Sequence, residues 1–175
     1  MVKKRTPISN YIESMLKEEV VYVCPLGISK KCQKFEAIGK PFTNHHIDKN
    51  PENSVYWNLI RICEPCHQEH NKQKDNLKLN RQIRLKKRNL AIQYFGGQAI
   101  DALRIAYVYG GTVSTPSSVL KLLKRGYLRI SIANVMSIGK PYHASFQEYE
   151  ITNEGKELIE KLLGTADISI NDFPI

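Results

Sequence analysis

Four cysteines, arranged in two pairs on either side of one short stretch, constrain this chain more than any other feature. Cys63 and Cys66 have the spacing Cys-x2-Cys, and Cys24 and Cys32 form a wider pair with seven residues between them. The first spacing lets two thiolates meet one tetrahedral zinc ion at about 2.3 Å. Because a small domain gains stability from a bound metal, the sequence predicts a structural zinc site. The alternatives are four reduced cysteines in an apolar core and a Cys-x2-Cys redox pair.

The length and composition predict a soluble, globular protein of two small domains. The chain has 175 residues, of which 42% are hydrophobic and 25% are charged, whereas a typical domain has roughly 100–200 residues. No apolar run reaches the roughly 7–15 residues of a secretion signal or the roughly 18 of a membrane-spanning helix. We therefore expect no membrane association and a cytoplasmic location, where thiols stay reduced and available to a metal.

The net positive charge of the chain comes entirely from its first half. Residues 1–97 hold 18 basic and 9 acidic side chains, whereas residues 98–175 hold 8 of each. A basic block attracts a polyanion over a long distance, and nucleic acid is the commonest soluble polyanion. The alternative is a solvated surface that only keeps the protein dispersed.

The hydrophobic pattern of the first half predicts a helix, then strands and loops, then a long helix. Residues 7–19 carry apolar side chains at helical spacing. Residues 20–58 have short apolar stretches broken by Gly and Pro, and a short strand is expected over residues 59–63. Residues 65–95 contain no Gly and only the initial Pro, so one continuous helix is expected there.

The second part of this expected helix is strongly basic. Residues 72–88 carry eight Lys and Arg against one acid, and their apolar residues form no clean stripe. We expect residues 76–97 to form a basic helical linker that lies along a phosphate backbone, the alternative being an inert solvated helix. The predicted DNA contacts on this linker are Lys78, Arg81, Arg84 and Lys87.

Histidine and asparagine residues lie between and directly after the two cysteine pairs. His45 and His46 are adjacent, Asn58 opens the stretch Asn-Leu-Ile-Arg-Ile, and His67 follows Asn58 by nine residues. In this order and spacing, the segment of roughly residues 20–75 resembles the HNH, or ββα-metal, endonuclease family. The resemblance implies an α+β protein in which a zinc-stapled hairpin and helix, within residues 1–75, bind one catalytic divalent cation.

The resemblance implies a role for each of these side chains. His45 matches a ligand of the catalytic cation, His46 matches the general base, and Asn58 matches the residue that holds the hairpin loop and so orients the His46 ring. Adjacent strand residues point to opposite sides, and an imidazole with a pKa near 6.5 accepts a proton at neutral pH. Each residue alone also fits a structural role, as a loop residue, a spare zinc ligand or a turn cap.

His67 matches the second metal ligand of the family and lies in the first turn of the expected helix. A further ligand is expected from the same helical face, either Asn71 or His70, with Asn71 favoured by the family pattern. So few protein ligands leave positions for water and phosphate oxygen. This suits Mg²⁺ or Mn²⁺, although imidazole ligands also admit nickel, cobalt or zinc.

The second half of the chain resembles a winged helix over residues 98–163, followed by a tail from Gly164 to Ile175. Its pattern predicts two helices, the second from a Thr115 N-cap to Arg125, then two strands and a closing helix. The resemblance implies that the second helix enters the major groove and that the turn from Asn134 to His143 is the wing. The candidate DNA contacts are Ser117, Ser118, Lys121 and Lys124.

The sequence therefore predicts a metal-dependent endonuclease that acts on double-stranded DNA. The HNH resemblance implies hydrolysis to 5′-phosphate and 3′-hydroxyl ends. Nicking of one strand and cleavage of both strands by a homodimer are both open. The rival from another class is a zinc-containing DNA-binding regulator without catalysis, which has no use for His46. RNA is an alternative substrate, and the second half, whose net charge is zero, is alternatively a protein-interaction or dimerisation domain.

Overall fold

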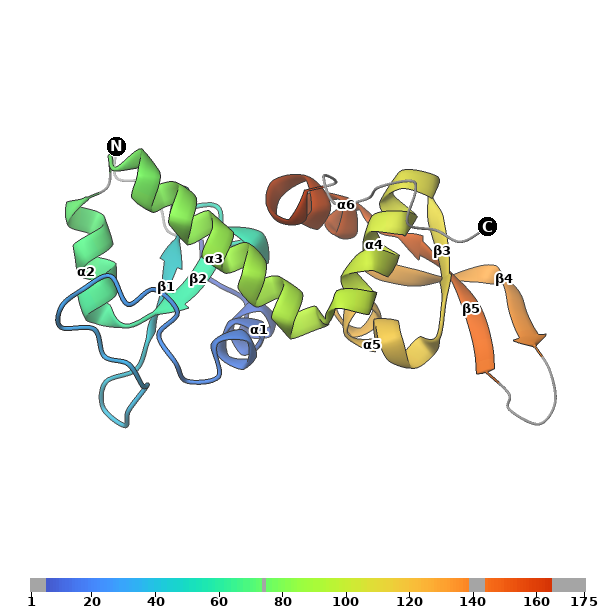
Figure 1. Ribbon diagram of the computed structural model, residues 1–175, viewed down its shortest axis with the longest axis horizontal. Helices are drawn as coiled ribbons and strands as arrows, with labels where there is room; N and C mark the ends of the chain where they lie inside the picture. The colour runs from blue at the N-terminus through green and yellow to red at the C-terminus, as the bar shows by residue number, and fades with distance from the viewer. Residues whose placement is uncertain (1–5, 74, 139–143, 165–175) are drawn as a thin grey trace. The chain divides into compact units, whose positions relative to one another are not determined.

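The computed structural model describes residues 6–73, 75–138 and 144–164, and the chain divides into two compact units. Unit 1 comprises residues 1–94 and unit 2 comprises residues 95–175 (Figure 1). The helix that covers the expected linker, residues 76–97, is part of unit 1 as far as Tyr94. None of the helices in the described ranges combines the length and apolar character needed to span a membrane.

Unit 1 begins with helix α1 (Asn10–Val20), close to the helix expected over residues 7–19. The Ser9 hydroxyl caps it by accepting a hydrogen bond from the Ile12 amide at 3.2 Å. This bond satisfies a backbone donor that the helix itself leaves unpaired. The apolar face of α1 is fully buried at Met15 and Leu16, so the helix packs into the core of the unit.

An antiparallel hairpin follows, formed by β1 (Thr43–His46) and β2 (Leu59–Ile62). The short 3-10 helix η1 (Tyr56–Asn58) leads into β2, all four residues of which are buried. The strand predicted at this place is therefore confirmed. Helix α2 (Glu64–Lys72) comes directly after the hairpin.

The prediction of a single long helix over residues 65–95 is wrong. The helix is interrupted after α2, and a second helix, α3 (Leu77–Phe95), follows. Asn76 lies at the break, and its Oδ1 accepts a hydrogen bond from the Leu79 amide at 3.0 Å. A short amide side chain competes with the helical backbone for hydrogen bonds and favours the start of a helix. The break consequently needs neither Pro nor Gly.

The core of unit 1 joins residues from α1, the hairpin, α2 and α3. Helix α3 enters it through Leu79, Ile83 and Leu90, none of which is more than 8% exposed. Helix α3 is thus a packed element of unit 1, and only its other faces are available to a partner. The core cluster comprises Val20, Cys24, Phe42, Ile47, Ile60, Ile62, Cys63, Cys66, Leu79, Ile83 and Leu90.

A buried ion pair ties α3 to α1. Lys87 Nζ lies 2.8 Å from Glu19 Oε1, and neither side chain has any exposed surface. Glu19 also accepts a hydrogen bond from the Tyr56 hydroxyl at 2.7 Å, and Lys87 Nζ lies 3.6 Å from the centre of the Tyr56 ring. The prediction that Lys87 contacts DNA is therefore wrong, because its ammonium group is enclosed by these partners and cannot reach a phosphate.

Unit 2 combines helices with a three-stranded antiparallel sheet. The strand order in the sheet is β3-β5-β4, with an irregularity in the β4–β5 register between Ile130 and Val135. The elements are α4 (Gly97–Tyr109), β3 (Gly111–Ser114), α5 (Pro116–Lys124), β4 (Leu128–Ile138), β5 (Ala144–Ile151), α6 (Asn153–Leu158) and the π-helical segment η2 (Ile159–Leu163).

The helices and strands expected in this half lie close to their predicted places, and β3 is additional. The closing helix α6 is capped by Thr152, whose hydroxyl accepts a hydrogen bond from the Gly155 amide at 3.1 Å. A Cβ at Gly155 would lie 2.3 Å from the Tyr127 carbonyl oxygen, so only glycine allows this approach. Of the predicted wing and tail, residues 139–143 and 165–175 lie outside the described residues.

Candidate functional site

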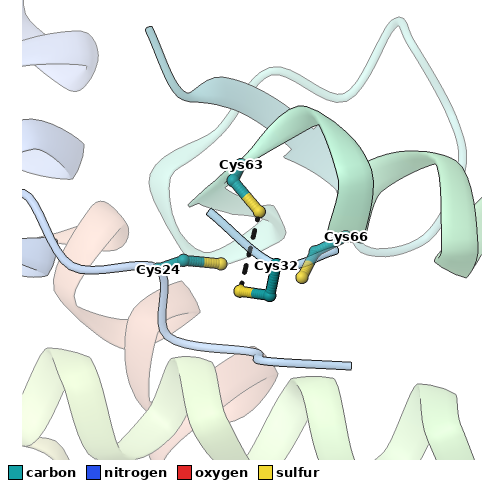
Figure 2. A group of neighbouring side chains, drawn as sticks. All are labelled: Cys24, Cys32, Cys63 and Cys66. Carbon is teal, nitrogen blue, oxygen red and sulfur yellow. Dashed lines mark hydrogen bonds between the residues drawn. The ribbon is translucent and has the colours of Figure 1, made fainter. Parts of the chain in front are cut away.

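The four cysteines converge on one point of unit 1 (Figure 2). Their sulfur atoms all lie within 4.8 Å of one another, and Cys32 Sγ is 3.8 Å from Cys63 Sγ. Around a tetrahedral zinc ion with Zn–S bonds of about 2.3 Å, any two sulfurs are about 3.8 Å apart. The predicted four-cysteine metal site is therefore present, and its geometry is consistent with a structural zinc ion.

Local backbone structure brings the two cysteine pairs together. Cys63 is the N-cap residue of α2, and Cys66 lies in the first turn of that helix. Cys24 follows the end of α1, where Val21 adopts a positive φ of 45° and redirects the chain. Cys32 comes from the loop after Cys24. The metal site thus joins the start of α2 to the segment that leaves α1.

The surroundings of the four thiols disfavour the loss of all four protons unless a cation is bound between them. Burial raises the pKa of the Cys63 thiol to about 11, and burial with the neighbouring sulfurs also raises the pKa of Cys32. Hydrogen bonds from backbone amides lower the pKa of Cys24 in spite of its burial. Four adjacent thiolates repel one another, so a bound dication is the group that stabilises this donor set.

A second group of candidate residues lines one cleft of unit 1. The cleft has a volume of about 300 Å³ and is lined by residues of β1, the loop after it and α2. It brings together His45, His46, His67 and Asn71, all of which were selected from the sequence. The other lining residues are Asn44, Lys49 and Pro51.

His45 contacts two further histidine rings. It is 4% exposed, and the centre of its ring lies 5.0 Å from that of His67 and 4.6 Å from that of His70, both in edge contact. Burial lowers the pKa of His45 to about 3, and the neighbouring histidines add to the shift. The ring is therefore neutral at neutral pH, which is the state in which imidazole binds a metal ion.

His70 is 1% exposed and is engaged at both ring nitrogens. Its Nε2 lies 2.7 Å from Asn80 Oδ1, which can only accept, so Nε2 carries the proton. Its Nδ1 must then accept, and the partner is His45 Nε2 at 2.7 Å. His45 consequently donates through Nε2 and keeps the lone pair of Nδ1. Asn71, rather than His70, lines the cleft.

His46 is held by a serine that the sequence pattern did not single out. His46 Nε2 lies 3.2 Å from Ser54 Oγ, and the Ser54 hydroxyl donates its proton to the Thr6 carbonyl oxygen at 2.8 Å. Because Ser54 has only one proton, it must accept from His46 Nε2–H. The neutral His46 ring is therefore basic at Nδ1.

Asn58 holds the loop that follows His46. Its Oδ1 accepts a hydrogen bond from the Asp48 amide at 3.0 Å, and its Nδ2 donates to Asp48 Oδ1 and to the Asn53 carbonyl oxygen, each at 2.8 Å. The Asn58 carbonyl oxygen also accepts from the Ile47 amide at 2.8 Å. With 2% exposure, Asn58 fixes both ends of the loop that carries Ser54.

His67 lies in the first turn of α2 and faces the same cleft. Its Nδ1 is buried and has no hydrogen-bond partner among the described residues, and the nearest carboxylate oxygen, Glu64 Oε2, is 3.5 Å away. Asn71 lies four residues further along α2 and is exposed, so both side chains lie on one face of the helix.

The basic residues predicted to contact DNA from α3 differ in exposure. Lys78, Arg81 and Arg84 are exposed, whereas Lys87 is buried as described above. On α5, Ser117, Lys121 and Lys124 are likewise exposed.

Ser118 differs from these α5 residues because its side chain is partly buried and used within unit 2. Its hydroxyl donates to the Thr115 carbonyl oxygen at 2.8 Å and lies 2.7 Å from Ser114 Oγ. These contacts hold the start of α5 in place. Ser118 is therefore less available to a partner than its three neighbours on the helix.

No family model, no curated protein and no solved structure matches this chain. The chemistry of the cysteine site and of the histidine cleft is therefore what points to a function.

Proposed function

We propose that this chain is a metal-dependent DNA endonuclease of the HNH type. The observation that carries the proposal is the cleft in which two adjacent histidines of β1 meet His67 and Asn71 of α2. A metal ligand and a proton acceptor are the two groups that phosphodiester hydrolysis requires of a protein. The basic charge of the first half supports a polyanionic substrate.

His45, His67 and Asn71 would hold one divalent cation, Mg²⁺ or Mn²⁺. The donor set fits, because His45 is neutral with a lone pair on Nδ1, and Nδ1 of His67 has no hydrogen-bond partner among the described residues. Two imidazoles and one amide leave coordination positions for water and phosphate oxygen. When bound, the cation neutralises the charge that develops on the phosphate in the transition state.

His46 would act as the general base. Nδ1 takes a proton from a water molecule whose oxygen attacks the phosphorus atom, and the bond from phosphorus to the 3′ oxygen breaks. The departing 3′ oxygen takes a proton from solvent, so the products are a 5′-phosphate and a 3′-hydroxyl. Ser54 holds Nε2 and thereby directs Nδ1 to the water, and Asn58 holds the loop that carries Ser54.

The zinc site would position α2 rather than take part in the chemistry. Cys63 and Cys66 belong to the start of the helix that carries His67 and Asn71. A closed set of four thiolates leaves no coordination position for substrate. Zinc bound there would therefore hold the start of α2 against the segment that leaves α1, and so fix the helix that carries His67 and Asn71.

We also propose that unit 2 is a winged-helix-like domain that contacts DNA through α5. The order helix, strand, helix and two strands supports this assignment. Exposed Ser117, Lys121 and Lys124 would be the contacts in the major groove. Two copies of the chain are needed if both strands are cut at one place, so unit 2 as a dimerisation domain is the competing outcome.

Cleavage of supercoiled plasmid tests the proposed activity. The purified protein is incubated with plasmid and with Mg²⁺, Mn²⁺ or Ni²⁺, and a parallel reaction contains a chelator added just before the DNA. Nicked or linear plasmid is expected only with the divalent cation. Binding without cleavage under all of these conditions would instead support the zinc-containing DNA-binding regulator.

A further inference from the structure

A second groove of unit 1, with a volume of about 400 Å³, is lined by three cations from two segments of the chain. Lys49 comes from the loop after β1, and Arg81 and Arg84 come from α3. Lys49 also lines the histidine cleft, so the groove and the cleft share a wall. The other lining residues are Ile47, Asp48, Leu77 and Asn80.

Among the described residues that line this groove, the one acid, Asp48, is already engaged by its own loop. Asp48 Oδ1 accepts hydrogen bonds from the Asn50 amide and from Asn58 Nδ2, both at 2.8 Å, and Oδ2 accepts from Asn53 Nδ2 at 2.7 Å. These bonds lower the pKa of Asp48 in spite of its partial burial. The charge of Asp48 therefore stabilises the loop, and the groove presents an excess of positive charge.

Lys49 has a strained backbone. Its φ is 61°, in the left-handed region, and its amide donates to the His46 carbonyl oxygen at 3.1 Å. For a side chain with a Cβ this conformation costs about 1–2 kcal/mol, whereas Asn or Gly adopts it more easily. Residues in such conformations cluster at functional sites. Val21 and Tyr22 also have positive φ angles, but of these three residues only Lys49 lines the groove and the cleft.

Only some of the basic residues of α3 line the groove. Leu77, Arg81 and Arg84 follow one another at helical spacing and share one side of the helix. Lys78 and Lys86 are exposed on the same helix but do not line the groove. Leu77 is 82% exposed and offers apolar contact beside the cations.

We propose that Lys49, Arg81 and Arg84 bind the phosphodiester backbone that leads into the histidine cleft. This inference rests on the proposed nuclease function and adds the path of the substrate. A guanidinium fork pairs with two oxygens of one phosphate, so Arg81 and Arg84 are suited to successive phosphates of one strand. Lys49 would hold the phosphate next to the bond that is cut, and Leu77 would contact a sugar.

The test compares two variants that lose the same charge. The groove variant carries Lys49→Asn, Arg81→Gln and Arg84→Gln, and the control carries Lys34→Gln, Lys40→Gln and Lys86→Gln, three exposed lysines outside the groove. Asn at position 49 suits the positive φ, so the groove variant should fold. Binding of a short fluorescent DNA duplex of mixed sequence is measured with zinc-loaded protein and no added Mg²⁺, Mn²⁺ or Ni²⁺, over a series of salt concentrations, so that cleavage is not supported.

We expect the groove variant to bind roughly 10- to 100-fold more weakly and to flatten the slope of log K against log salt by about 0.9 for each phosphate that the variant no longer neutralises. The control variant should keep nearly the parental slope. Equal losses of affinity in the two variants would mean general charge attraction and would overturn the groove assignment.

Cleavage separates the failure of this inference from the failure of the proposed function. Lys49→Asn alone should raise KM for plasmid with little change in kcat, because Lys49 contacts substrate but not the reacting atoms. A parent that cuts plasmid, together with a groove variant that binds as the parent does, refutes the groove and leaves the nuclease standing. A parent that neither binds nor cuts DNA refutes both.

Discussion

His70 Nδ1 lies 2.7 Å from His45 Nε2, and both rings are almost completely buried. Because Asn80 fixes the proton of His70 on Nε2, the contact leaves His45 with a proton on Nε2 and a lone pair on Nδ1. A partner that fixes the tautomer of a metal-binding imidazole also raises its basicity. His70 and Asn80 are therefore positioning residues for His45 in its proposed role as a metal ligand.

Asn80→Leu should allow His45 to adopt either of its two neutral tautomers. Without an acceptor for the His70 Nε2 proton, His45 loses its fixed hydrogen bond, and affinity for the catalytic cation should fall by about 10–100-fold. Nitrogen-15 NMR of the zinc-loaded protein, without added Mg²⁺ or Mn²⁺, should show the Nε2-protonated form of His45 in the parent and a mixture in the variant. Gln82→Leu, an exposed position two residues away on α3, is the control. An unchanged His45 tautomer in Asn80→Leu would contradict the claim that Asn80, through His70, fixes the proton of His45.

The four-cysteine site should contain one tightly held zinc ion per chain. Cys63→Ser removes one of the four thiolates at the start of α2, so unit 1 should lose its cooperative thermal transition. Ser29→Ala, in the loop between Cys24 and Cys32, should keep both the metal and the transition. Elemental analysis and circular dichroism measure the two effects. A metal-free protein that melts as the parent does would remove the zinc from this account.

The buried pair of Lys87 and Glu19 should matter for stability and not for DNA binding. Lys87→Met leaves the Glu19 carboxylate buried without its partner and should cost about 3–5 kcal/mol of unfolding free energy in urea. Lys86→Met, the exposed neighbour, should change it by less than about 0.5 kcal/mol. Adding Glu19→Met to Lys87→Met should restore much of the loss. Equal effects of Lys86→Met and Lys87→Met would contradict the buried placement of Lys87.

Stability should fall with acid because of His45. The pKa of His45 is about 3 in the folded chain, below the roughly 6.5 of an unfolded histidine. The unfolded state therefore takes up the proton first as the pH falls. The contribution is complete above about pH 6.5 and is lost progressively down to about pH 3, at up to about 1.4 kcal/mol per pH unit.

His45→Gln should flatten this pH dependence in urea titrations of the zinc-loaded protein without added Mg²⁺ or Mn²⁺. The variant keeps the four cysteines, so acid effects on the zinc site are common to both proteins and cancel in the difference. A variant with the parental slope between about pH 6.5 and pH 3 would show that His45 is not the neutral, buried group described here.

The chemistry-bearing residues of unit 1 could be chosen from the sequence because their spacing is local. The Cys-x2-Cys pair starts a helix, and His67 and Asn71 share one face of that helix through its regular period. Adjacent His45 and His46 both line the cleft although neighbouring strand residues alternate in direction. The cleft also includes Lys49 and Pro51 from the loop after β1. The strand pattern alone did not indicate that contribution.

Long-range pairing explains what the sequence did not reveal. Lys87 looks like one basic residue among many, and its burial depends on Glu19, which is 68 positions away in the chain. Ser54 meets His46 through a loop that Asn58 closes, and no residue pattern marks that contact. The break before α3 depends on one asparagine cap, whose effect competes closely with helix continuation. Strand β3 has four residues, too few for an alternating pattern.

The cleavage rates of His45→Ala and His46→Ala, measured on plasmid over a range of Mg²⁺ or Mn²⁺ concentrations, test the central proposal most directly. His45→Ala removes a metal ligand, so its activity should be partly recovered at high metal concentration. His46→Ala removes the base and leaves the metal ligands in place, so it should bind DNA and cation nearly as the parent does and still cleave about 10²–10⁴-fold more slowly at every metal concentration. Cleavage by His46→Ala at the parental rate would contradict the assignment of the base.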